Sequence, residues 1–287
     1  MIVKNEFTLN IWYLTCFLFL FISYSCISKK HITNTVDDFH LVWSDEFNVD
    51  GNPSKTNWNY EYGFVRNQEE QWYQKENAIC KDGYLTITAK KETKKNPFFS
   101  SKIDKSWRKK RDSIKITSSC LITKNKHSWQ YGRFEMRAKI PTGKGIWPAF
   151  WTLGLEGDWP ANGEIDIMEY YKGDIWANMA WESTGRGKSV WDNKTISLNE
   201  FGDSKWSEEF HVWRMDWDEN FIKLFIDNKL VNELDLTTTY NGTNNKNPFH
   251  QPHYLLINLA VGGINGGDVG QETLPAKYVI DYIRVYQ

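Results

Sequence analysis

Short runs of alternating apolar and polar residues follow one another through most of the chain, separated by turn residues. Side chains on a β-strand alternate faces with a period of two, so such runs predict strands with one buried face. The clearest runs are residues 84–89, 132–140, 221–226, 254–261 and 278–286. Helical periodicity is nearly absent. The pattern therefore predicts an all-β sandwich or jelly roll.

One of these strands is unusually acidic. Residues 164–169 read Glu-Ile-Asp-Ile-Met-Glu. The period of two places Glu164 and Asp166 on one face and the isoleucines on the other. Glu169 is out of step, and it returns to the acidic face only if one residue, which we expect to be Met168, is taken up in a β-bulge. Bulges often lie beside active sites.

Three carboxylates on one face repel one another, and this crowding should raise the pKa of at least one of them. Retaining glycosidases use a related arrangement, with two carboxyl groups about 5 to 5.5 Å apart. Taken alone, however, the triplet fits an exposed edge strand with ordinary surface acids equally well.

Motifs on both sides of the acidic strand favour the glycosidase. Residues 145–151 read Gly-Ile-Trp-Pro-Ala-Phe-Trp, and further motifs lie at 131–137, 258–263 and 281–286. In this order they resemble glycoside hydrolase family 16, in its bacterial laminarinase-like branch of endo-β-glucanases, over roughly residues 39–287. The Glu-x-Asp-x-x-Glu form is that branch's signature. The resemblance implies a concanavalin-like jelly roll of two antiparallel sheets, with a substrate cleft on the concave sheet.

The resemblance also implies roles for the acids. Glu164 would be the nucleophile that forms a glycosyl-enzyme bond. Glu169 would be the acid/base that protonates the leaving oxygen and then deprotonates water, which retains the anomeric configuration. Asp166 would hydrogen-bond Glu164 and help to set which carboxylate keeps the proton. No cofactor would be required for catalysis.

Several aromatic residues are candidates for sugar binding. Trp147, Trp151 and Trp159 would form a sugar-stacking floor, although any single tryptophan could instead belong to the core. Asn67 begins an Asn-x-Glu-x-Gln-x-Tyr segment that resembles the family's, where the asparagine contacts sugar hydroxyls.

One departure from the family bears on the substrate. Where many laminarinases carry a histidine, this chain has Ala180. Trp181 and Trp191 would shape the leaving-group side instead, which keeps mixed-linkage β-glucan open beside laminarin. His250 and His253 are expected to be structural.

The family often binds a structural calcium ion far from the chemistry. Glu46, Gly83 through its carbonyl, and Asp281 stand at the matching positions, and hard oxygen ligands suit calcium. Asp281 could equally be a strand-end acid. For Arg133 and Glu135, which alternate on one strand face, a structural role is favoured.

Composition limits the number of domains and the kinds of partner. The 287 residues suit one large domain, expected to be a monomer, and the formal net charge of -1 gives no footprint for nucleic acid. The aromatic content of 16% suits the flat faces of sugars.

A basic insertion at 90–111 predicts a solvated loop, with a loop bordering the cleft or meeting an anionic envelope as the alternative. Cys80 and Cys120 could pair, but are expected to be buried thiols.

The first residues predict export. Residues 1–26 read as a signal peptide, and 23–26 resemble a relaxed lipobox in which Cys26 would be lipidated. A simple secretory signal or an uncleaved anchor is the alternative. Residues 27–38 would be a polar tether. We therefore expect an outer-membrane or cell-surface lipoprotein, or otherwise a periplasmic or secreted protein, whose only membrane contact is the anchor.

The sequence leaves three functions in competition. The leading one is a hydrolase of β-1,3- or mixed-linkage β-glucan. The same fold also cleaves the algal galactans agar, porphyran and carrageenan. Jelly rolls also bind sugars without cleaving them, as lectins do.

Overall fold

The computed structural model describes residues 39–202 and 205–287, which fold into two β-sheets. The signal peptide, the Cys26 lipidation site and the tether predicted for residues 1–38 lie outside the described residues. No helix in the described residues is long and apolar enough to cross a membrane.

The larger sheet has ten strands. Its order is β15 (Lys229–Asp235), β14 (Phe221–Ile226), β13 (His211–Trp217), β8 (Gly132–Lys139), β17 (Ala276–Tyr286), β5 (Tyr84–Lys95), β6 (Ser113–Ser118) and β3 (Gln71–Tyr73), with β1 (Leu41–Asp45) paired to β17 and β4 (Ala78–Lys81) paired to β5. Apart from the parallel β3–β6 pair, the strand pairs in the described residues are antiparallel.

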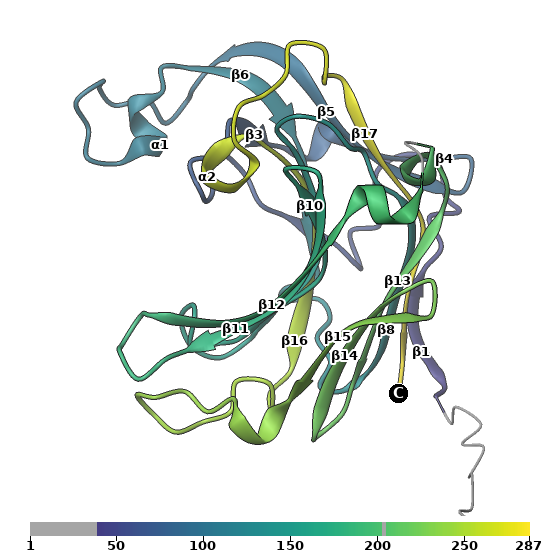
Figure 1. Ribbon diagram of the computed structural model, residues 1–287. Coiled ribbons are helices and arrows are strands. Elements are labelled where there is room, and N and C mark those ends of the chain that lie inside the picture. Colours follow the sequence, from purple (N-terminus) through teal and green to yellow (C-terminus); the bar gives the residue numbers. More distant parts are fainter. Residues whose placement is uncertain (1–38, 203–204) are drawn as a thin grey trace, which may run out of the picture. The chain divides into compact units, whose positions relative to one another are not determined.

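The smaller sheet has seven strands. Its order is β12 (Ser189–Ser197), β11 (Asp174–Glu182), β10 (Glu164–Tyr171), β9 (Ile146–Gly154), β16 (His253–Val261), β7 (Cys120–Ile122) and β2 (Asn59–Tyr60). The helical segments are short: α1 (Trp107–Lys110), α2 (Gly263–Gly266), η1 (Lys75–Asn77), η2 (Leu198–Phe201), η3 (Trp206–Glu208) and η4 (Leu236–Thr238). Figure 1 shows the two sheets as separate layers, with β10 and β16 in one and β8 and β13 in the other.

The core lies between the sheets and follows from strict alternation. In β8 the residues Phe134, Met136 and Ala138 are fully buried, whereas the residues between them are partly exposed. Trp213 and Met215 of β13 meet them from the neighbouring strand. The five strand predictions made from alternation are confirmed, because they coincide with β5, β8, β14, β16 and β17. The jelly-roll prediction is confirmed with them.

Two tight turns have the expected chemistry. Asp227 and Asn228 join β14 to β15 with φ of 47° and 67°, and Asp82 and Gly83 join β4 to β5 with φ of 54° and 81°. Two consecutive positive φ values define the hairpin turn that matches strand twist, and they favour Asn, Asp and Gly.

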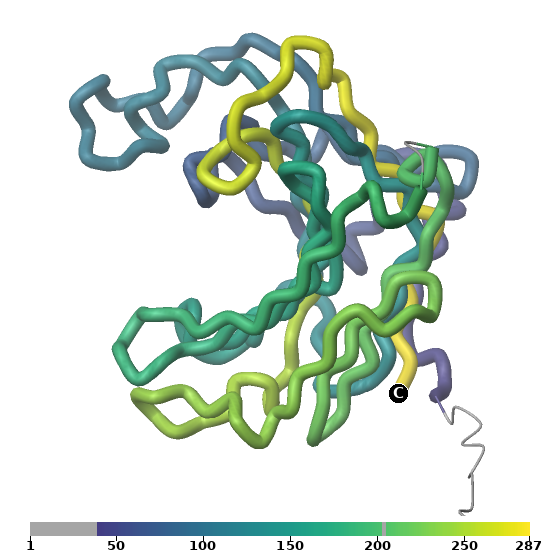
Figure 2. Tube along the Cα trace, in the orientation of Figure 1, coloured from purple at the N-terminus to yellow at the C-terminus, as the bar shows by residue number. Residues whose placement is uncertain are grey.

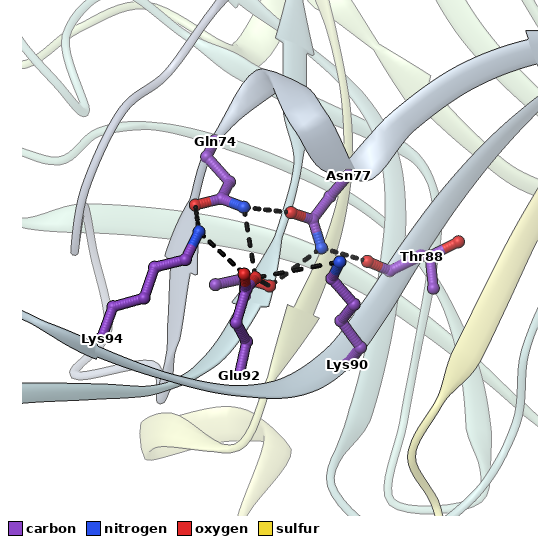
Figure 3. Close-up of polar contacts among 7 residues, drawn as sticks. Gln74, Asn77, Thr88, Lys90, Glu92 and Lys94 are labelled. Atoms are coloured by element: carbon purple, nitrogen blue, oxygen red, sulfur yellow. Dashed lines mark hydrogen bonds and ion pairs between the residues drawn. The ribbon is translucent and has the colours of Figure 1, made fainter.

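The basic insertion is less loop-like than predicted. Residues 90–95 extend β5 and pair with β6, and only 96–112 leave the sheet. Figure 3 shows why the lysines can remain in a strand: Glu92 lies 2.9 Å from Lys94 and 3.9 Å from Lys90, and it accepts a 2.8 Å hydrogen bond from Thr117. These ion pairs reduce the repulsion between Lys90 and Lys94. We call residues 96–112 the lobe.

The two cysteines of the described region are buried and unpaired, as predicted. Burial raises the pKa of the Cys80 thiol to about 12, and it raises the pKa of the Cys120 thiol as well. Both groups are therefore held neutral and serve as small apolar residues.

Candidate active site

The acidic strand carries the predicted bulge. Asp166 lies opposite Asn178 and Glu169 lies opposite Trp176, so two residues of β10 face the single Ala177 of β11. Both residues of the bulge, Ile167 and Met168, are buried in the core between the sheets, at 1% and 0% exposure. The bulge is therefore confirmed, but the extra residue on the β9 side is Ile167, because Met168 pairs with Phe150. The bulge brings the three acids to the concave face of the smaller sheet.

Each catalytic candidate has its own hydrogen-bond donors. Trp159 donates its indole N–H to Glu164 Oε2 at 2.6 Å. Trp147 donates to Glu169 Oε1 at 2.8 Å, and Asn178 donates to Glu169 Oε2 at 3.4 Å. Asp166 is 2% exposed and lies between the two glutamates in sequence. The donors come from β9, β11 and the loop before β10, so the sheet itself positions the carboxylates.

The three carboxyl groups titrate together. Burial and the charge on Glu164 raise the pKa of Glu169 to about 8, against hydrogen bonds from Trp147 and Asn178. Burial and both neighbouring glutamates raise the pKa of Asp166 well above its usual range. Burial also raises the pKa of Glu164, but hydrogen bonds from Trp159 and Asp166 and the charge of Arg66 oppose it. The surroundings thus favour a proton on Asp166 and Glu169 and the anion at Glu164.

A cavity of about 390 Å³ surrounds the acids. It brings together eight of the nine predicted catalytic and sugar-binding residues, Trp181 being the exception. The lining is Arg66, Asn67, Glu69, Trp147, Ala149, Trp151, Leu153, Trp159, Glu164, Asp166, Glu169, Trp191, Asn258 and Asn265.

The lining tryptophans fall into two kinds. Trp159 and Trp191 are 48% and 39% exposed, with ring centroids 6.4 Å apart, so their faces are open to a ligand. Trp147 and Trp151 are 5% and 7% exposed. The Trp151 ring is covered by the Arg66 guanidinium at 5.0 Å, and its N–H is bonded to Asn258 at 2.7 Å. Open stacking surfaces are therefore found at Trp159 and Trp191.

The prediction for Trp181 is wrong. Ala180 lies opposite Glu164 on β10 and opposite Trp191 on β12, so Ala180 and Trp191 share the concave face. The strand period turns the next residue to the other face, where Trp181 is buried and meets Phe249 edge to face. Trp191 alone of the predicted pair reaches the cavity.

Sequence reasoning missed Arg66, the only cation in the lining. Its guanidinium pairs with Glu61, and its Nη1 atom is buried with no hydrogen-bond partner among the described residues. Glu69 and Asn258 also line the cavity, and both lie in motifs that the sequence already displayed. The sequence did offer one signal for Arg66: it directly precedes Asn67, which was already a predicted sugar-binding residue.

Two of the three predicted calcium ligands are held by arginines. Glu46 accepts two 2.9 Å hydrogen bonds from Arg284, and Asp281 lies 2.5 Å from Arg137. No group of three or more His, Cys, Asp or Glu suited to a metal occurs within residues 39–202 and 205–287. The predicted set has only two carboxylates and the Gly83 carbonyl, so calcium binding stays an untested prediction.

The remaining polar candidates have structural partners, as expected. Arg133 pairs with Asp216 at 2.7 Å, and Glu135 accepts from Tyr282 at 2.7 Å. His253 is fully buried between Thr152 and the Pro248 carbonyl, each at 3.0 Å. His250 contacts the Glu219 carbonyl at 3.0 Å.

Comparison with known proteins identifies the family. The model of glycosyl hydrolases family 16 matches residues 64–284. The chain belongs to this family. The family 16 domain is 35% identical to a β-glucanase of Rhodothermus marinus, over 87% of this chain and 85% of that protein.

Solved structures agree with the family assignment. The laminarinase catalytic domain of Thermotoga maritima has a TM-score of 0.73 at 34% identity, covering 87% of this chain and 98% of that one. A structure from work on endo-acting O-glycanases of human gut bacteria that initiate mucin breakdown has a TM-score of 0.78 at 34% identity, covering 87% and 91%. This family 16 chain is therefore a glycoside hydrolase.

A deletion and an insertion test the bulge. Deleting Met168 leaves Glu-Ile-Asp-Ile-Glu, which the strand period keeps on the concave face, so we expect hydrolysis to persist despite a loss of about 2–5 kcal/mol of stability. Inserting alanine after Met168, with Ile167 and Met168 both kept in the core, turns Glu169 towards the core and should abolish hydrolysis. Activity and circular dichroism are measured for both. A folded deletion variant as inactive as the insertion variant would contradict this account.

Titration of Glu169 should limit both activity and stability. Because its folded pKa of about 8 exceeds its unfolded value near ~4.3, the folded protein holds the extra proton between them, and stability falls as pH rises through that window. Glu169→Gln should match the wild type near pH 4 and exceed its unfolding free energy by on the order of 1–3 kcal/mol at pH 9, after allowing for solvent screening. Wild-type kcat/KM should fall above about pH 8, where the acid is lost.

Urea unfolding at pH 4, 6 and 9 measures this effect. Glu156→Gln, on an exposed loop residue outside the cavity lining, is the matched control. A pH-independent gap between Glu169→Gln and the wild type would disprove the titration.

Proposed function

We propose that this glycoside hydrolase is an endo-acting β-glucanase that cleaves β-1,3 or mixed β-1,3-1,4 linkages with retention of configuration. The observation that carries the proposal is the bulged strand, which sets Glu164, Asp166 and Glu169 on one concave face with separate N–H donors for the two glutamates. The names of the Rhodothermus and Thermotoga relatives support the substrate class.

In the proposed first step, Glu164 attacks the anomeric carbon and the glycosidic bond breaks. Trp159 supports this role, because its N–H stabilises the carboxylate before attack. Glu169 gives its proton to the departing oxygen, and its raised pKa keeps that proton available at neutral pH.

In the second step, Glu169 takes a proton from water, and the water oxygen displaces Glu164 from the sugar. Protonated Asp166 would donate a hydrogen bond to Glu164 and so steady its charge as it leaves.

The charges of the lining bear on the competing substrates. Four carboxyl groups and a single arginine line the cavity. A sulfated galactan would find a single cation in this lining, Arg66, which is already paired with Glu61, so carrageenan and porphyran fit it poorly. The retained triad and the raised pKa of Glu169 speak against a lectin.

One observation favours a second candidate, an endo-acting O-glycanase of mucin. The structure from that class has a higher TM-score than the Thermotoga laminarinase at equal identity. The replacement of the expected histidine by Ala180, with Trp191 beside it, also leaves the leaving-group side different from that of many laminarinases.

A substrate panel separates these functions. We expect the wild type to release reducing ends from laminarin or barley β-glucan, and not from carrageenan or agarose. Glu169→Gln should lose on the order of 10²–10⁴-fold in rate, Glu164→Gln at least as much, and Glu156→Gln almost nothing. Proton NMR of the first products should show the β-anomer. Release from mucin O-glycans alone would favour the second candidate, and α-anomers would exclude retention.

From the sequence of residues 1–38 we further propose export and lipidation at Cys26. Palmitate labelling of the full chain in a bacterial host should therefore occur in the wild type and disappear in Cys26→Ser, because the lipid is attached through the Cys26 sulfur. Equal labelling of both chains would refute the anchor.

A further inference from the structure

We infer that the lobe, residues 96–112, positions the substrate-binding turn 66–69 through the guanidinium of Arg111. The kinetic effect expected from this inference rests on the proposed function, whereas the contact between Arg111 and the turn does not. Figure 2 traces the lobe in blue at the margin of the protein, near the turn that holds α2.

Arg111 donates hydrogen bonds to the backbone of the turn from two nitrogens. Its Nη2 donates to the Gln68 carbonyl at 2.8 Å, and its Nη1 donates to the Glu69 carbonyl. The guanidinium also lies over the rings of Phe64 at 4.6 Å and Trp107 at 4.9 Å. A planar fork that stacks and donates twice is specific to arginine, and lysine cannot reproduce it.

The turn requires such support because its backbone is strained. Asn67 and Gln68 have φ of 51° and 53°, a region that residues other than glycine seldom adopt. Conformations of this kind persist where the surrounding structure holds them in place.

The opposite side of the turn is held by the segment that opens α2. Ile264 donates its N–H to the Asn67 carbonyl at 2.8 Å. Gly263 permits this approach, because a Cβ there would lie 2.7 Å from the same carbonyl oxygen. The turn is thus fixed between α2 on one side and Arg111 on the other.

The lobe is itself anchored, so it can serve as a support. Trp107 packs on a small cluster formed by Phe64, Trp72 and Ile114. Asn96 is buried and donates to the carbonyl of Arg111 at 2.6 Å. At its base, the Glu92 network in Figure 3 joins β5 to β6.

The turn supplies Arg66, Asn67 and Glu69 to the cavity lining, whereas Arg111 is absent from that lining. Arg111 is therefore a positioning residue. The reacting glutamates take their donors from Trp147 and Trp159, which belong to other segments. Arg66, whose charge favours the Glu164 anion, is also held by its ion pair with Glu61, which the Arg111 variants leave in place. Loss of the Arg111 hydrogen bonds should consequently weaken glucan binding more than the chemical step.

The test compares Arg111→Gln and Arg111→Lys with Lys109→Gln, at an exposed residue of α1 two positions before Arg111. On barley β-glucan we expect both Arg111 variants to raise KM about tenfold, with kcat within about twofold of the wild type, because two charged hydrogen bonds are lost. Arg111→Lys should not restore the wild-type KM, since lysine keeps the charge but lacks the planar guanidinium with its two donors. Lys109→Gln should behave as the wild type.

Amide hydrogen exchange of residues 64–70 provides a readout without substrate. Exchange should accelerate at least tenfold in both Arg111 variants and stay unchanged in Lys109→Gln. Unchanged exchange in Arg111→Lys, or a fall in kcat at constant KM, would overturn the inference. A wild type inactive on every β-glucan would reject the proposed function instead, and the exchange result would still decide whether Arg111 holds the turn.

Discussion

Charge crowding on one face of β10 is the constraint on which the site depends. Three carboxyl groups share a partly buried surface where burial and mutual repulsion both favour their neutral forms. The indole N–H groups of Trp147 and Trp159 oppose this at one glutamate each. Because the two environments differ, the proton and the negative charge settle on different residues. Acid chemistry and nucleophilic chemistry can then coexist on one strand.

The core behind the strand holds this arrangement in place. Ile167 and Met168 are consecutive residues, yet both are buried. Removing each from water contributes about 1.5–3 kcal/mol, which favours the bulge over a regular strand that would expose one of them. Apolar burial on one face of β10 therefore determines where the acids stand on the other. Packing and catalysis are coupled within six residues.

This local coupling explains what the sequence could predict. The period of two is a property of neighbouring residues, so it identified the strands, the shared face of Glu164 and Asp166, and the need for a bulge before Glu169. Trp181 was misplaced although the same period applies to it: with Ala180 facing the cleft, the next residue faces the core. The pairing that sets Trp191 opposite Ala180 could not be predicted in this way, because register is a relation between two strands.

Loops were predicted least well, for a related reason. Arg66 lies between β2 and β3, where no periodicity indicates which way a side chain points. The basic insertion looked like a solvated charge run, because nothing in its sequence indicates that Glu92 pairs with two of its lysines or that Arg111 reaches Gln68. Contacts between side chains and distant carbonyls follow from tertiary structure alone.

The sheet and the loops both contribute to the cleft, and they have different consequences for specificity. The acids and their donors are fixed mainly by the hydrogen-bonded register of the sheet, which tolerates little change. Arg66 and Asn67 are held by contacts from a loop, and loops accept substitution and insertion more readily. Within one fold, the chemistry should therefore stay constant while the choice of glycan varies with the loops. For this chain, the one cation of the lining is already paired with Glu61, which supports the proposal of a neutral glycan.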